Sequence, residues 1–121
     1  MTIHEILHKQ YPAALLKIAD KRYHRPNREY LWKELVSSYM EDYKYLAEIT
    51  DCDDFTLFLH AWIRQQQYKE KWDKPLAFGE AWSAQHALNI AVLNTNEVVL
   101  VEPQNDYILP ADAHDIVFVR M

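Results

Sequence analysis

The sequence contains one cysteine, Cys52, and aspartates surround it at positions 51, 53 and 54. The apolar residues that follow are spaced for one face of a helix, so Cys52 is expected in the first helical turn, with Asp51 as the N-cap. There the unpaired backbone N–H groups and the positive end of the helix dipole stabilise a thiolate, which is a nucleophile. The same position is typical of a small buried hydrophobic residue, and the aspartates oppose ionisation of the thiol. The apolar face consists of Phe55, Phe58, Leu59, Trp62 and Ile63.

A histidine and a glutamate lie at the open end of a predicted β-hairpin. After Lys74-Pro75 the apolar residues alternate along 86–93 and again along 97–102, with the turn residues Asn94-Thr95-Asn96 between them. If the turn has three residues, His86 and Glu102 lie diagonally on one face, about 7 to 8 Å apart. A turn of two or four residues would place them on opposite faces.

The hairpin face that carries His86 also carries apolar residues, and we expect it to turn toward the Cys52 helix. A thiol, an imidazole and a carboxylate would then meet at one edge of the core, as the nucleophile, base and orienting group of a cysteine hydrolase do. Asn89 is an odd number of residues from His86 and so lies on the opposite face of the strand. This favours Glu102 over Asn89 as the residue that orients the imidazole. The apolar residues on the His86 face are Leu88, Ile90, Val98 and Leu100.

Three segments of the sequence together resemble one known family. They are Asp51-Cys52-Asp53-Asp54-Phe55, Trp82-Ser83-Ala84-Gln85-His86-Ala87-Leu88-Asn89 and Val101-Glu102-Pro103-Gln104-Asn105-Asp106. In order and spacing they look like the papain-like cysteine protease domain at the C-terminus of Marasmius oreades agglutinin and its small bacterial and phage relatives. The resemblance spans roughly residues 43–107.

The resemblance implies a peptidase or amidase that acts on a peptide or protein substrate, with Cys52 as nucleophile, His86 as base and Glu102 as the residue that orients His86. It also implies calcium near the active site, with Asp53, Asp54 and Gln104 as ligands, and no organic cofactor. Calcium prefers such oxygen ligands, and its charge would offset the aspartates beside the thiol. Without a metal, the helix dipole alone accounts for Asp53 and Asp54.

The elements that must position these residues form an α+β pattern. We expect helices over 3–18, 29–40 and from Asp51 onward, then strands over 76–82, 86–93, 97–102 and 115–120. The predicted fold is a papain-like minimal core in which N-terminal helices pack on one side of a small antiparallel sheet. One domain over 1–121 is expected, with a helical part at 1–42 and the papain-like core at 43–121.

Composition limits the partners and the compartment. Thirteen Lys and Arg against 18 Asp and Glu give a net charge of −5, which argues against a nucleic-acid partner. The sequence has no apolar run of membrane-spanning length and no signal peptide pattern. We therefore expect a protein that is cytoplasmic or phage-associated and has no membrane partner.

Other interpretations of the sequence remain open. The fold could serve as a catalytically silent binding or structural module, for example in a phage particle. His4-Glu5-Ile6-Leu7-His8 matches a metalloprotease pattern, but a surface helix with two solvated histidines explains it better. The basic residues Lys21, Arg22, Arg25 and Arg28 favour a solvated loop, and His60 is expected at the flank of its helix.

Overall fold

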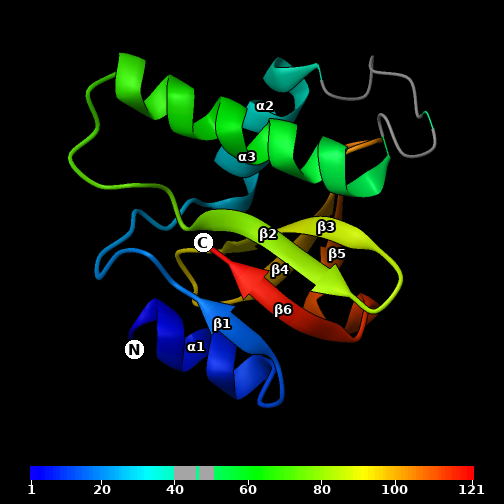
Figure 1. Cartoon of the computed structure of the whole chain (residues 1–121). Coiled ribbons are helices and arrows are strands. Elements are labelled where there is room, and N and C mark those ends of the chain that lie inside the picture. The colour runs from blue at the N-terminus through cyan, green and yellow to red at the C-terminus, as the bar shows by residue number, and fades with distance from the viewer. Residues whose placement is uncertain (40–45, 47–50) are drawn as a thin grey trace.

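The computed structural model describes residues 1–39, 46 and 51–121 (Figure 1). The helices are α1 (Ile3–Gln10), α2 (Arg28–Ser38), α3 (Cys52–Lys69) and a short 3-10 helix at Ala111–Ala113. The strands are β1 (Leu15–Lys17), β2 (Phe78–Ser83), β3 (Ala87–Val92), β4 (Val98–Glu102), β5 (Tyr107–Pro110) and β6 (Ile116–Arg120).

The strands form one six-stranded sheet in the order β1-β6-β2-β3-β4-β5. The pair β1 and β6 is parallel, and every other neighbouring pair is antiparallel. β2 and β6 approach closely at Gly79, where an added Cβ would lie 2.1 Å from the backbone oxygen of Arg120. The protein therefore needs glycine at this position because no side chain fits between the two strands.

Helices cover both faces of the sheet, with α1 on one side and α2 and α3 on the other (Figure 1). Ile3, Ile6 and Leu7 of α1 pack with the even-numbered residues of the central hairpin, such as Ile90 and Leu100. On the opposite face, α2 and α3 pack with odd-numbered residues of the same hairpin. This second core includes Leu31, Leu35, Leu59, Ile63, Ala91, Val99 and Val101. The alternation of side chains along each strand thus separates two cores.

This architecture corrects the expected fold class. The helices do not lie on one side of the sheet, and the sheet is mixed and larger than a small antiparallel one. Leu15 to Lys17, expected in a helix, instead form β1, since they pair in parallel with residues 118–120 of β6. A tertiary pairing between distant segments overrides the local helical spacing here. β5 was not predicted from the sequence.

The other predicted elements are confirmed with shifted ends. Asn27 caps α2 by accepting the backbone N–H of Tyr30 at 2.7 Å, and Tyr39 ends the helix with φ of 55°. The expected end of this helix at Met40 and the expected boundary at 42/43 lie outside the described residues. Among the helices of the described ranges, none is long and apolar enough to cross a membrane.

Candidate functional site

The predicted register between the strands that carry His86 and Glu102 is confirmed. Asn89 pairs with Val101 and Ile90 with Leu100, and Leu93 donates its backbone N–H to Glu97 across the three-residue turn. Asn96, the last residue of the turn, has φ of 69°, a left-handed conformation that asparagine tolerates. The His86 ring donates from Nε2 to Glu102 Oε2 at 2.7 Å. This hairpin therefore forms the expected imidazole–carboxylate pair.

The expectation that the apolar face of the hairpin on the His86 side packs on the Cys52 helix is wrong. Glu102 alternates onto the same face of β4 as Val98 and Leu100. Those two residues pack with α1, whereas α3 covers the other face of the sheet. Asn89, on the opposite face, bonds to α3, because its amide Nδ2 donates to the backbone oxygen of Thr56 at 3.0 Å. The ring of His114 lies beside that of His86, with the two centroids 5.5 Å apart.

Cys52 is the first residue of α3, as predicted, and it is neither fully buried nor fully exposed. Within the described part of the chain, its sulfur makes no hydrogen bond with His86 or Glu102. The structure thus joins two members of the predicted triad, His86 and Glu102, by a hydrogen bond. The catalytic roles of Cys52, His86 and Glu102 stay a prediction.

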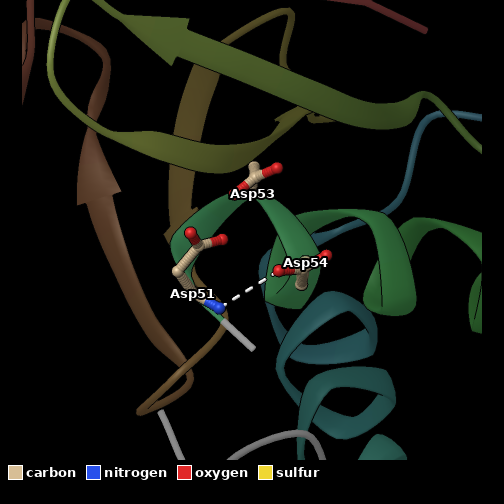
Figure 2. A group of neighbouring side chains, drawn as sticks. All are labelled: Asp51, Asp53 and Asp54. Carbon is tan, nitrogen blue, oxygen red and sulfur yellow. Dashed lines mark hydrogen bonds between the residues drawn. The ribbon is translucent and has the colours of Figure 1, made fainter. Parts of the chain in front are cut away.

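Asp51, Asp53 and Asp54 surround the start of α3 (Figure 2). Asp51 is the N-cap residue, and its backbone N–H donates to Asp54 Oδ2 at 3.1 Å. One oxygen from each side chain lies within 4.8 Å of the others. Oxygens that share one calcium ion at about 2.4 Å lie no more than about 4.8 Å apart. Asp51 Oδ1 is buried without a hydrogen-bond partner, so the donor set fits such an ion.

The predicted calcium ligand Gln104 lies just after β4. Its backbone N–H donates to Glu102 Oε1 at 3.3 Å, which links this turn to the His86–Glu102 pair. Asp53 and Asp54 belong to the acidic group at the start of α3. Calcium binding by Asp53, Asp54 and Gln104 stays a prediction.

A groove between α2 and β5 was not predicted from the sequence. Its volume is about 720 Å³, and its walls carry the side chains of Trp32 and Tyr107, which are 52% and 64% exposed. The apolar residues at helical spacing in this segment are Leu31, Trp32, Leu35, Val36 and Tyr39, and of these only Leu31 and Leu35 are buried. Helical spacing alone does not distinguish Trp32 from the buried positions, because all five share one face of the helix.

His60 lies at the flank of α3, as expected, but its partner was not predicted from the sequence. The side chain is 12% exposed where α3 meets the sheet, and its Nδ1 donates to Glu80 Oε2 of β2 at 2.9 Å. Glu80 gave no signal as a core residue because charged side chains are seldom buried unless they are paired. His4 and His8 are exposed on α1 with stacked rings, as expected of a surface helix.

Comparison with known proteins gives a fold but no family. No protein-family model and no curated protein matches the sequence. The structure of a PSL1a–E64 complex superposes with a TM-score of 0.84 at 22% identity, over 98% of this chain and 48% of that one. Polyporus squamosus lectin bound to the human-type influenza-binding epitope Neu5Acα2-6Galβ1-4GlcNAc gives a TM-score of 0.81 at 21% identity, over 100% and 49%. The chain therefore spans about half the length of each neighbour.

These neighbours correct the family assignment made from the sequence. The resemblance pointed to a papain-like cysteine protease domain and so to a hydrolase, whereas the structure with the same fold is named as a lectin. Short motifs of a few residues carried that assignment, and similar motifs can occur on different frameworks. The fold of this chain is one that the lectin chain contains over about half of its length.

Proposed function

We propose that this protein is a binding module whose ligand is a carbohydrate. The observation that carries the proposal is the groove between α2 and β5, where Trp32 and Tyr107 are largely exposed beside polar side chains. Arg28, Glu29 and Asp106 line the same groove. A large exposed aromatic side chain in a hollow is a typical feature of a binding site.

The chemistry of the groove suits a sugar. The apolar C–H face of a pyranose ring packs on an aromatic ring, and the ring hydroxyls need charged or amide groups at the edges. Arg28 is held in place by Glu97, whose Oε2 accepts from its guanidinium at 3.0 Å. A guanidinium fixed in this way can bind a hydroxyl or a sugar carboxylate with little loss of side-chain entropy.

The lectin neighbour supports the same proposal. That protein is bound to Neu5Acα2-6Galβ1-4GlcNAc, and this chain matches about half of it. Binding of this trisaccharide by the isolated chain is therefore the direct test of whether the matched half binds a sugar.

The test is saturation-transfer NMR with Neu5Acα2-6Galβ1-4GlcNAc and with Galβ1-4GlcNAc, which lacks the acidic sugar. Trp32→Ala and Tyr107→Ala should each weaken binding about 5- to 10-fold, because each removes roughly 1 kcal/mol of ring stacking. Tyr68→Ala is the matched control, since Tyr68 is 87% exposed and lies outside the groove. Absence of transfer from the wild-type protein to both sugars would overturn the proposal.

A second candidate function is covalent chemistry at Cys52. Two observations favour it: the 2.7 Å bond between His86 and Glu102, and the E64 complex of one structural neighbour. With Nε2 bonded to Glu102, His86 Nδ1 is the nitrogen left to take the proton of Cys52. The thiolate would then attack an electrophilic carbon of a bound ligand, forming a C–S bond as the bond from that carbon to an oxygen or nitrogen leaving group breaks. The proton held on His86 Nδ1 would pass to the leaving group, with Glu102 orienting the imidazole.

This second candidate is tested by the rate at which the thiol is alkylated. Mass spectrometry should show that iodoacetamide modifies Cys52 faster in the wild-type protein than in His86→Asn, with Glu102→Gln in between. His114→Asn is the control, because its ring touches His86 without bonding to Glu102. Equal rates in wild type and His86→Asn would exclude activation of the thiol by His86.

We further propose that calcium binds at Asp53 and Asp54, with Gln104 as a ligand and Asp51 beside them. An ion that binds only the folded chain raises the melting temperature by mass action. Millimolar calcium should therefore raise the melting temperature of metal-stripped protein, and Asp53→Asn with Asp54→Asn should remove the response. A response that survives both substitutions would place the ion elsewhere.

A further inference from the structure

A cavity of about 610 Å³ lies on the α3 side of the sheet, away from the groove between α2 and β5. Its walls come from α3, from β2, and from the ends of β1 and β6. Charged and titratable side chains line it together with apolar ones such as Leu57 and Ile18. The polar side chains are Lys17, Asp20, His60, Arg64, Glu80 and Arg120.

The inner wall holds the buried pair of His60 and Glu80, whose side chains are 12% and 7% exposed. Because Glu80 is a carboxylate, the His60 ring must donate from Nδ1 to Oε2. The other ring nitrogen, Nε2, is buried and has no hydrogen-bond partner among the described residues. A buried polar atom without a partner costs free energy, so this nitrogen points to a bound water or ligand group.

Three cations line the same cavity. The pairing of Lys17 with Arg120 and of Arg120 with Glu80 sets these side chains in one row on one face of the sheet. Arg64 approaches from α3 and is fixed by donating to the backbone oxygens of Leu76 at 3.0 Å and Phe78 at 3.3 Å.

In the described part of the chain, none of these cations is held in a close ion pair. Across the described ranges, no ion pair within 4.0 Å joins Lys17, Arg64 or Arg120 to an acidic group. Asp20 and Glu80 are the lining carboxylates, and the main-chain oxygen of Met121 already accepts from Ala19 and Tyr23. The side chains of the lining thus carry one more positive than negative charge, before any proton on His60. Burial lowers the pKa of Arg64, and the nearby Tyr23 and Asp20 offset part of this effect.

We infer that this cavity is a binding site for a small organic carboxylate. The carboxylate accepts hydrogen bonds from Arg120 and Lys17 at the opening and from Nε2 of His60, which takes up a proton when it lies between the ligand and Glu80. The organic part of the ligand packs on Leu57, Ile18 and Ala61. The apolar lining favours a weakly hydrated organic anion over inorganic phosphate, which would have to lose its water there.

The experiment is an NMR titration of the full chain with benzoate, its neutral analogue benzamide and inorganic phosphate. Benzoate is expected to shift the ring resonances of His60 and to bind about tenfold more tightly at roughly pH 6 than at roughly pH 8, because binding takes up a proton. Benzamide and phosphate are expected to bind at least about tenfold more weakly than benzoate.

Two variants localise the binding. Arg120→Gln and Lys17→Gln should each weaken benzoate binding about fivefold or more, and both residues are exposed, so the fold is expected to survive. Arg22→Gln is the matched control, since Arg22 is an exposed arginine outside the cavity. A His60→Gln variant removes the proton uptake, and its benzoate affinity should lose its dependence on pH.

Several outcomes would overturn the inference. They are no binding of benzoate at tens of millimolar, equal binding of benzamide, tighter binding of phosphate, or unchanged affinity in both Arg120→Gln and Lys17→Gln. Sugar binding and thiol alkylation involve other residues. A negative result here therefore leaves the proposals for the groove and for Cys52 intact.

Discussion

The protein holds two histidine–glutamate pairs in different surroundings. His86 and Glu102 belong to one hairpin, are bonded at 2.7 Å, and are 28% and 15% exposed. His60 and Glu80 come from a helix and a strand, are bonded at 2.9 Å, and are 12% and 7% exposed. The first pair follows from strand register alone, whereas the second exists only because α3 packs on β2.

The difference shows how burial changes what an ion pair does. The hairpin pair is the more exposed of the two, so water screens its contribution to stability. The α3–β2 pair is less exposed, so each partner depends more on the other for its hydrogen bond. We therefore expect substitutions at the buried pair to change folding and substitutions at the hairpin pair to change chemistry.

The largest expected loss of stability comes from replacing Gly79. This residue lets β2, the strand that carries Glu80, approach β6 closely. A Cβ at this position would lie 2.1 Å from the Arg120 oxygen and 2.9 Å from Cα of Met121. Because backbone must move, Gly79→Ala should destabilise the protein by about 3 kcal/mol or more. Urea denaturation measures the loss, with Ala84→Gly in the exposed turn as a control. A cost below about 1 kcal/mol would mean that β2 and β6 can separate freely.

The two glutamates should differ in their effect on stability. Glu80→Ala leaves both ring nitrogens of His60 buried without partners and should cost about 2 to 4 kcal/mol. Glu102→Ala removes the partner of a more exposed ring and should cost about 1 kcal/mol or less.

Chemical denaturation of both variants at neutral pH tests this contrast. Glu80→Gln keeps a hydrogen-bond acceptor for His60 and should recover part of the loss, which separates the hydrogen bond from the charge. If Glu102→Ala is the more destabilising variant, the comparison between the two pairs fails.

The smallest expected effect concerns Glu34, a partly buried carboxylate whose neighbour is a phenol instead of an imidazole. Burial raises the pKa of Glu34, and burial followed by the Glu34 charge raises the pKa of Tyr30 to about 12. A raised carboxyl pKa means that the folded state binds the proton more tightly, so wild-type stability falls as pH rises from about 4.5 through the raised value.

Glu34→Gln removes this titration and should stabilise the protein at neutral pH by under about 1 kcal/mol, because the side chain is partly exposed to solvent. The melting temperature of the variant minus that of the wild type should rise between about pH 4.5 and the raised pKa of Glu34, and it should stay level at higher pH. A constant difference at every pH would mean that the carboxyl does not titrate differently in the folded state.

Sequence reasoning succeeded where structure depends on neighbouring residues. The turn length at Asn94-Thr95-Asn96 fixed the register and so the meeting of His86 with Glu102. Sequence reasoning also located α3 and its N-cap at Asp51, because helical spacing and capping are local properties. The family assignment and the helical prediction for residues 15–17 failed, since short motifs and local spacing do not specify which distant segment a strand pairs with.

The sequence by itself determined the helical spacing of α2 and α3, the alternation and register of the central hairpin, and the single thiol at a helix start. The tertiary structure alone decided that even-numbered hairpin residues face α1 and that odd-numbered ones face α3. Alternation in a strand separates two faces but does not say which helix covers each, because that depends on how all the apolar surfaces are buried together. For the same reason, only the fold could bring Glu80 against His60 and line one cavity with Lys17, Arg64 and Arg120.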